Sequence, residues 1–500
     1  MTAAPADAGI RAPVRPQQAI TVAVLLAAAP LLGGKALEES AVPTRAVIWA
    51  SLALASYAAG LLCLVGAGHG GVRLASWKFG YWILLWYGVT FGLATVTWTG
   101  PQASTAAEIA LSSVLRALWL VAVGLTFWVA GYLVGPGQSA RRLAARGIGA
   151  LGNRLTGTVR SRYTPWILYG IGTAARVATT LTTGRFGYVG DVSSAVTTAT
   201  GYGQFLGALS LFAPLAVCAA ALQVYRDHLP GARVTLAVLF LTELAFGAAA
   251  GGKESFVIAL LAVVIPMSAA RRSIPKTAMI AGVLIFLAIV IPFNEAYRGV
   301  ARSGSVTLSP SEAIHEAPAI FRQTLAGDSV IAALPKSVIY LLQRIREIDS
   351  PAIIMQRTPG QIAFSSPVQL IEAPLVDIVP RALWPGKPIL ATGYQFSQQY
   401  YGLPATVYTS SAITPIGDLY RHGGWIPVLA GMFLLGCGVR LLDDVLDVRV
   451  NAHAIFLVLL LFPSLVNGED DWATFLAGIP VIVVIWLLAL AFTFRTRRPA

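Results

Sequence analysis

The chain has 500 residues, of which 56% are hydrophobic and only 12% are charged, with a formal net charge of +13. An average soluble domain carries about 25% charged residues, so the composition argues against a soluble protein. Nucleic-acid binding is disfavoured because a basic footprint gathers on one polar domain, whereas the positive charges here lie in short loops between apolar blocks. The composition predicts a polytopic membrane protein.

The apolar residues form repeated blocks of about 17 to 20 residues, the length that crosses roughly 30 Å of hydrocarbon. We therefore expect an all-α bundle of about twelve transmembrane helices, with one large external loop that contains short helices. The predicted spans lie near residues 19–33, 46–66, 79–98, 113–134, 165–182, 206–225, 234–250, 256–270, 277–293, 425–442, 453–466 and 474–494.

The basic residues alternate between the two sides of these spans. Twenty of the 36 Lys and Arg residues fall on the side of the termini, while the intervening short loops carry only Lys35, Arg45, Arg185 and Lys253. The positive-inside rule places both termini in the cytoplasm of a cell membrane protein. A cleaved secretory signal is the alternative for the first block, but no small-x-small site follows that block and the alternation requires it as a span.

The expected segments follow from this topology. They are a cytoplasmic tail at 1–18, spans one to nine at 19–293, an extracellular or periplasmic loop at 294–424, spans ten to twelve at 425–494, and a cytoplasmic tail at 495–500. This loop is much longer than a simple connection between two spans, so we expect it to be structured or functional. Within it, Ser309 and Glu312 have capping-box spacing, and apolar residues from Val338 to Ile348 follow helical spacing along one face.

Cationic residues accumulate on the predicted outer side. A charged side chain near a span is costly unless it serves a pocket, a partner or an interface. Arg offers forked donors to phosphate oxygens, so such a group over apolar helices suits a lipid-linked phosphate or pyrophosphate. The alternative is that each side chain extends to the lipid headgroups or pairs locally. The pyrophosphate-binding candidates are Arg298, Arg381, Lys387, Lys253, Arg344 and Arg185.

Signals for metals and cofactors are weak. The five histidines are scattered, and neither a His-Glu-x-x-His motif nor a cysteine-rich spacing is present. The acidic pair Glu38-Glu39 could imitate the pair of metal-using membrane glycosyltransferases, but an exposed pair beside Lys35 more often only solvates a loop. No Walker A sequence is present. We expect no metal site, no cofactor and no nucleic-acid partner.

Several motifs on the outer side together resemble the O-antigen polymerase family, the oligosaccharide repeat unit polymerases. The most specific is Pro380-Arg381-Ala382-Leu383-Trp384-Pro385-Gly386-Lys387-Pro388. Supporting matches are Gly251-Gly252-Lys253, Tyr297-Arg298, the run from Arg344 to Ser350, Arg357-Thr358-Pro359 and Gly417-Asp418-Leu419-Tyr420. Together the motifs span roughly residues 184–424, about half of the chain.

The resemblance implies a metal-independent glycosyltransferase that joins undecaprenyl-pyrophosphate-linked sugar units on the outer face of the membrane to make a surface polysaccharide. It implies a lipid-linked oligosaccharide as donor and as acceptor, with membrane lipids, a flippase and a chain-length regulator as further candidate partners. In this chemistry, preorganised positive charge stabilises the departing pyrophosphate, and a general base deprotonates the acceptor hydroxyl. The candidates for the base are Asp349, Asp418, Glu469 and His422.

Two other functions stay open at this point. A ligase would pass a finished glycan to a different acceptor, and a deletion strain would then accumulate long unattached chains rather than single units. A transporter or flippase of anionic lipid-linked substrates would be expected to show repeated halves with paired Gly- or Pro-interrupted spans, which are not evident in the sequence.

The polymerase hypothesis predicts that Arg381→Ala and Arg298→Ala each stop chain elongation while membrane insertion stays intact. The reason is that removing one preorganised donor to the leaving group typically costs roughly 3 kcal/mol of barrier. The measurement is the length distribution of the polymer in cells that carry each variant. Normal distributions in both variants would defeat the hypothesis.

Overall fold

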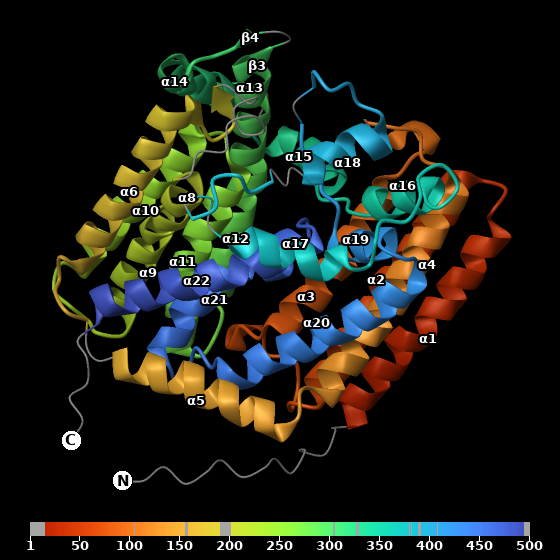
Figure 1. The fold of residues 1–500 in the computed structure, drawn as a ribbon, viewed down its shortest axis with the longest axis horizontal. Helices are drawn as coiled ribbons and strands as arrows, with labels where there is room; N and C mark the ends of the chain where they lie inside the picture. Colours follow the sequence, from red (N-terminus) through yellow and green to blue (C-terminus); the bar gives the residue numbers. More distant parts are fainter. Residues whose placement is uncertain are drawn as a thin grey trace.

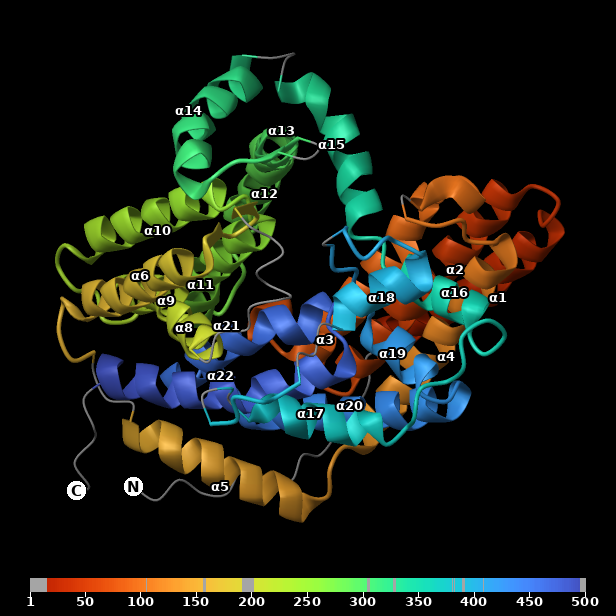
Figure 2. The same ribbon diagram turned by 45° about the horizontal axis from the view of Figure 1, so that its top comes forward.

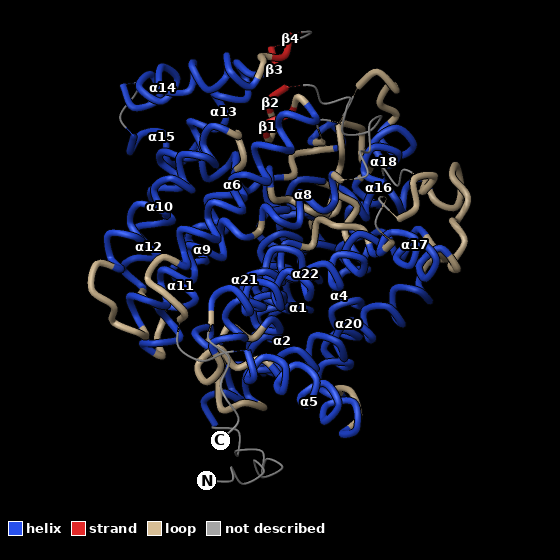
Figure 3. Tube along the Cα trace, turned by 60° about the vertical axis from the view of Figure 1, so that its left-hand side comes forward, coloured by secondary structure: helices blue, strands red, loops and turns tan. Residues whose placement is uncertain are grey.

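The computed structural model describes residues 16–104, 106–155, 159–190, 202–303, 306–326, 330–379, 381, 383–388, 392–407 and 409–494. The predicted C-terminal tail and all but residues 16–18 of the predicted N-terminal tail lie outside these residues. The described chain is helical apart from two short hairpins, as Figure 3 shows, so the prediction of an all-α membrane bundle is confirmed.

The N-terminal part of the chain forms a group of apolar helices and one polar helix. The elements are α1 Pro16–Glu38, α2 Pro43–Ala67, α3 Phe79–Tyr87, a π turn Gly88–Gly92, a 3₁₀ turn Leu93–Thr97, α4 Leu111–Val134 and α5 Gln138–Leu155. α5 carries a cluster of arginines and lies across one end of the bundle (Figure 1).

The central part forms a second group. Its elements are α6 Thr164–Thr183, the hairpin strands β1 Arg185–Phe186 and β2 Val189–Gly190, α8 Gly203–Ser210, α9 Phe212–Tyr225, α10 Ala232–Ala249, α11 Lys253–Arg271, α12 Lys276–Ile285, a π turn Phe286–Val290 and α13 Ile291–Ala301. A second hairpin follows, with β3 Arg302–Ser303 and β4 Val306–Thr307.

The predicted loop contains short helices, and the chain then returns to the bundle. The loop helices are α14 Pro310–Ala326, α15 Val330–Arg344, α16 Asp349–Arg357, α17 Gln369–Ile378, α18 Thr392–Tyr401 and α19 Pro415–Arg421. The last three helices are α20 Trp425–Val445, α21 Ala452–Asn467 and α22 Trp472–Thr493.

The local loop predictions have mixed outcomes. The capping box is confirmed, because the Ser309 amide donates to Glu312 Oε2 at 2.8 Å and the Glu312 amide donates to Ser309 Oγ at 3.3 Å, directly before α14 begins. The amphipathic helix predicted to run to Ile348 is too long. α15 ends at Arg344, and the next residues turn so that Ile348 is buried before α16 begins.

All twelve predicted spans are helical. Ten helices of the described chain are long and apolar enough to cross a membrane, which makes the chain a multi-pass membrane protein. The other two are α6, which contains Arg176, and α21, which has 16 residues. α21 is buried on all sides among other helices, whereas α6 lies at the outer edge of the bundle and exposes Ile167 and Leu181 (Figures 1 and 2).

The first group packs with α20, and the second group packs around α9. Figures 1 and 2 show the two groups side by side, with α21 and α22 between them. Glycines allow α4 and α20 to touch: a Cβ atom at Gly131 would meet the Phe433 carbonyl, and one at Gly436 would meet the Trp128 carbonyl. Small residues commonly allow such close backbone contact between membrane helices.

A buried carboxylate ties α20 to the start of α3. The Asp443 side chain accepts from the amides of Phe79 and Gly80 at 2.7 and 2.9 Å, and from the Tyr132 hydroxyl at 2.8 Å. The first amides of a helix have no partner within the helix, so a carboxylate at this point satisfies them and favours the helix dipole.

We predict that Asp443→Ala destabilises the protein by about 3 kcal/mol, because it leaves three buried hydrogen-bond donors without an acceptor. Asp444→Ala is the matched control: Asp444 pairs with Arg141 and Arg440 at the surface, where such pairs contribute about 1 kcal/mol or less. The measurement is thermal unfolding of the two variants in detergent. Equal shifts of the unfolding midpoint would contradict the structural role of Asp443.

Candidate functional site

The tight turn between α10 and α11 is held by α13. The Gly251 carbonyl accepts from Asn294 Nδ2 at 2.9 Å, and from Arg298 Nε at 3.1 Å and Nη2 at 3.0 Å. Gly251 has φ +67°, and a Cβ atom there would press on the Tyr297 ring at 3.3 Å. The glycine is therefore needed both for the turn and for the close approach of α13.

Three cations from three helices interact electrostatically beside this turn, and we call them the cation cluster: Lys253 of α11, Arg298 of α13 and Arg344 of α15. Arg298 and Arg344 are the positive charges that act on the Lys253 ammonium, together with the carboxylate of Glu295. The Lys253 Nζ lies 4.6 Å from the centroid of the Tyr340 ring, and the Arg298 guanidinium lies 3.6 Å from that of Tyr188. The aromatic faces hold both cations in place.

The Lys253 ammonium is buried and has no hydrogen-bond acceptor among the described residues. An ammonium that is removed from water costs free energy unless acceptors replace the water. Arg298 uses its Nε and one Nη2 hydrogen on Gly251, which leaves further donors of the guanidinium for another group. The cluster is therefore built to accept an anion with several oxygens.

Carboxylates face the same region from three turns, and we call them the carboxylate group: Glu254, Glu347, Glu469 and Asp470. Burial first, and then the charges of Glu469 and Asp349, raise the pKa of Glu347 well above its ordinary value. Glu469 also acts on Glu254 and on Asp470. Arg344 acts on Glu347 as well as on Lys253, so the carboxylate group and the cation cluster are neighbours.

Asp349 lies at the edge of this region. Its carboxylate forms a forked ion pair with Arg346, at 3.1 Å from Nε and 2.7 Å from Nη2, and burial raises its pKa against the opposing effect of Arg346. Arg346 also donates to Thr97 and Ala103 of the first helix group. Two of the four predicted base candidates, Asp349 and Glu469, therefore act on Glu347, and Glu347 is in turn a neighbour of Arg344 in the cation cluster.

Asp418 and His422 belong to a separate network at α19. Asp418 Oδ1 accepts from Arg421 at 2.6 and 3.0 Å, and Oδ2 accepts from the Trp472 amide at 3.0 Å. His422 Nδ1 lies 2.8 Å from the Asp418 carbonyl oxygen. These bonds fasten α19 to the start of α22, so both side chains are engaged in holding the fold.

The side chains of Arg381 and Lys387 bond within their own loop, while the Arg381 amide donates to Gln204 Oε1 of α8 at 3.3 Å. The Lys387 ammonium donates to the Asp377 carboxylate at 3.0 Å and to the carbonyls of Asp377 and Val379 at 2.9 and 3.2 Å, which uses all three of its hydrogens. Arg381 donates to the carbonyls of Lys387 and Pro388. The structure therefore does not bring these two cations to Lys253. Pro380 and Ala382 of the same motif lie outside the described residues.

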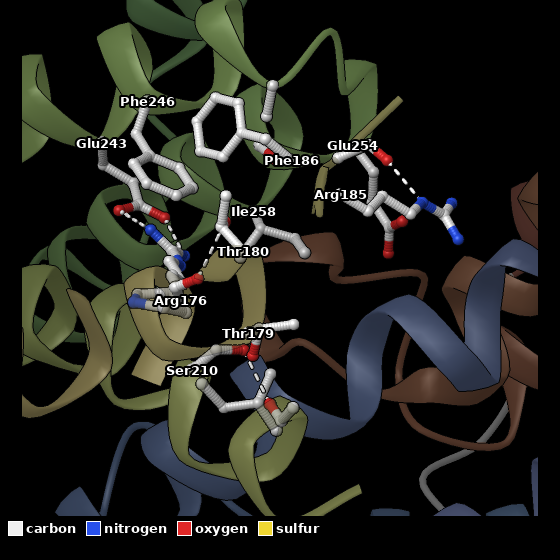
Figure 4. A pocket seen from close by; sticks show the side chains of 16 residues that line it. Arg176, Thr179, Thr180, Arg185, Phe186, Ser210, Glu243, Phe246, Glu254 and Ile258 are labelled. Carbon is white, nitrogen blue, oxygen red and sulfur yellow. Dashed lines mark hydrogen bonds and ion pairs between the residues drawn. The ribbon is translucent and has the colours of Figure 1, made fainter. Parts of the chain in front are cut away.

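Arg185 lines a cavity next to the cluster, between α6, α8, α10 and α11 (Figure 4). The hairpin that contains Arg185 adjoins the cluster. The Arg298 guanidinium lies over the Tyr188 ring, and the Tyr188 amide donates to the Ala250 carbonyl at 2.9 Å. Of the six predicted pyrophosphate ligands, the structure brings Lys253, Arg298 and Arg344 together, places Arg185 beside them, and engages Arg381 and Lys387 elsewhere.

Sequence reasoning missed Glu347, Glu254 and Glu243. Glu243 lies in the middle of an apolar helix, which is itself a signal of function or of a buried partner. Glu254 follows the Gly-Gly-Lys motif directly. Glu347 stood within the run from Arg344 to Ser350, but its burial could not be read from spacing. Among the described residues, no group of three His, Cys, Asp or Glu side chains is placed to hold a metal ion.

The fold and this site define a multi-pass helical membrane protein with a cationic site at one end of the bundle. The chain belongs to a family described as a domain of unknown function (DUF8712), whose model matches residues 168–447. The match contains the whole cation cluster and the adjoining cavity. Comparisons with curated proteins and with solved structures found no match.

The carboxylate group predicts a pH dependence of stability. Burial, followed by the charges of Asp471, Glu469 and Glu254, raises the pKa of Asp470 from 3.8 to about 6. The folded protein thus binds this proton more tightly than the unfolded chain. The associated stability is present below pH 3.8 and is lost as the pH rises through about 6.

We expect Asp470→Asn to be more stable than the wild type by about 2 kcal/mol at pH 7.5, and to lose this advantage at pH 4, since the amide carries no charge at either pH. Unfolding midpoints of both proteins, measured in detergent at the two pH values, provide the test. A constant difference between the proteins across this range would show that the pKa of Asp470 is not raised in the folded state.

Proposed function

We propose that this protein is a membrane glycosyltransferase that polymerises undecaprenyl-pyrophosphate-linked oligosaccharide units into a surface polysaccharide on the outer face of the cell membrane. The observation that carries the proposal is the cation cluster, in which a buried ammonium that has no acceptor among the described residues lies beside two guanidinium groups. The resemblance of the surrounding motifs to the O-antigen polymerases supports the choice of substrate.

The cluster is suited to the leaving group of this reaction. The bond between the anomeric carbon of the donor sugar and the pyrophosphate oxygen breaks, and its electron pair stays on that oxygen. Lys253, Arg298 and Arg344 would balance the resulting charge, and they are already in place before the reaction. Lys253 lies at the end of an apolar helix, so the prenyl chain could extend along that helix into the bilayer.

The carboxylate group supplies the other half of the chemistry. The acceptor hydroxyl oxygen forms the new bond to the anomeric carbon, and its proton passes to a base. A carboxylate whose pKa is raised is a stronger base than an ordinary one. Glu347 has this character, and Asp349 and Glu469 adjoin it. No metal is required for either step, because the pyrophosphate is already a good leaving group.

The arrangement of the chain supports the outer face as the place of reaction. The loop helices α14, α15 and α18 lie at one end of the bundle, whereas α5, the start of α1 and the end of α22 lie toward the other (Figure 1). α5 bears Arg141, Arg142 and Arg146, and basic loops favour the cytoplasmic side. Both termini would then be cytoplasmic, and the cation cluster would face outward.

We predict that Lys253→Ala and Arg344→Ala each slow chain elongation by about 100-fold, because each removes a preorganised cation from the leaving group. Lys336→Ala is the matched control: Lys336 is exposed on α15 like Arg344, but it lies eight residues earlier, about 12 Å along the helix, and is not among the charges that act on Lys253. The measurement is the ratio of single lipid-linked units to polymer in a strain that carries only the variant.

Accumulation of single units in Lys253→Ala and Arg344→Ala, with normal polymer in Lys336→Ala, would support the polymerase. Long chains that stay unattached would instead indicate a ligase. Unchanged polymer in both cluster variants, at normal protein levels in the membrane, would refute the proposal.

A further inference from the structure

The cavity between α6, α8, α10 and α11 has a volume of about 340 Å³, within the range of small-ligand sites. Its wall includes a forked ion pair between Arg176 and Glu243, with N to O distances of 2.6 and 2.8 Å. Arg176 precedes the end of α6 at Thr183 by seven residues, about 10 Å along the helix. The cavity therefore extends from the Gly251 end of these helices well into the bundle (Figure 4).

The charges that line the cavity balance. Arg176 is neutralised by Glu243, and Arg185 lines the same wall as Glu254 (Figure 4). An anion would be repelled by Glu254, and a cation would be repelled by Arg185. This lining differs from the cation cluster, and it favours a ligand that is uncharged and rich in hydrogen-bonding groups.

The unpaired groups of the cavity include donors and acceptors. Within the described chain, Arg185 uses only its Nε, on the Gly187 carbonyl at 2.8 Å, and Glu254 forms no hydrogen bond or ion pair. The hydroxyls of Thr179, Thr180 and Ser210 donate to carbonyls of their own helices, so they present acceptor lone pairs to the cavity. Hydroxyl groups, which donate and accept, match such a set.

The cavity shares its wall with the cation cluster. Ala250 and Glu254, which line the cavity, flank the turn that positions Lys253 and that Arg298 grips. A ligand whose pyrophosphate lies on the cluster would have its next group within reach of the cavity. In a lipid-linked glycan, the group attached to the pyrophosphate is a sugar.

We propose that this cavity binds an uncharged sugar residue of the lipid-linked substrate, through Arg185, Glu254 and the hydroxyl-bearing face of α6. The inference rests on the proposed function, since it names the part of the substrate that the neighbouring site holds. Phe186 and Phe246 provide apolar surface for the faces of the ring. The Arg176–Glu243 pair forms the polar wall deeper in the bundle.

The test uses the full chain in lipid nanodiscs and two probes. One probe is the lipid-linked unit extracted from a host strain that carries only Lys253→Ala, which accumulates that unit if the proposed function is correct. The other is farnesyl pyrophosphate, which has the pyrophosphate and a prenyl chain but no sugar. Binding of each probe to the wild type and to the variants is measured directly.

Gly207→Leu fills the cavity, because Gly207 lines it and a Cβ atom there meets nothing within 4 Å. Gly170→Leu is the matched control: Gly170 lies on α6, is equally open and is not part of the cavity wall. Glu254→Gln is a second variant that keeps the shape of the side chain and removes its charge.

We expect Gly207→Leu and Glu254→Gln each to weaken binding of the sugar-bearing probe by about tenfold, and to change binding of farnesyl pyrophosphate by less than about twofold. Gly170→Leu should leave both unchanged. Undiminished binding of the sugar-bearing probe to both cavity variants would overturn the inference. Equal loss of both probes would overturn it too, since the cavity would then belong to the pyrophosphate site.

Failure of the proposed function gives a different result. In that case the Lys253→Ala strain accumulates no lipid-linked unit, or the wild type does not bind farnesyl pyrophosphate. Either result refutes the cation cluster as a pyrophosphate site, and the sugar assignment falls with it.

Discussion

The Gly251 carbonyl is the contact on which the site depends. This oxygen accepts from Asn294 and from two atoms of Arg298, so it fixes the end of α13 against the start of α11. Lys253 follows two residues later, so the turn determines where its side chain lies. Because Asn294 and Arg298 both donate to this one oxygen and Gly251 leaves no room for a side chain, α13 packs closely on the turn and keeps Arg298 near Lys253 despite the repulsion between their charges.

The helices were predictable because their signal is physical and local. A run of apolar residues long enough to cross a bilayer forms a helix in that solvent whatever its neighbours are, since every backbone group must be satisfied within the segment. All twelve predicted spans are helical for this reason. The end of α15 was mispredicted because apolar spacing continues through Ile348, while the chain turns to bury that residue.

The site was only partly predictable, because a motif shows which residues occur but not what each side chain contacts. The motif that contains Arg381 and Lys387 is the most specific match to the polymerase family in the chain. In the structure, however, all three ammonium hydrogens of Lys387 are donated to Asp377 and Val379. Lys253 occurs in a less distinctive motif, and its buried ammonium has no acceptor in the part of the chain that the structure describes. The difference between a structural and a binding cation lies in unused donors, which only tertiary structure reveals.

α15 contacts both helix groups: it packs against the 3₁₀ turn at Leu93–Thr97 on one side and against α13 on the other. Just beyond its end, Arg346 bonds to Thr97 and Ala103, and the Glu347 amide bonds to the Thr90 carbonyl. The supports from the first helix group, namely the 3₁₀ turn, Thr90, Thr97 and Ala103, all precede residue 168, where the family match begins. A truncated protein cut at that boundary would retain every cluster cation and lose the platform that orients one of them, so the recognisable segment and the functional unit are not coextensive.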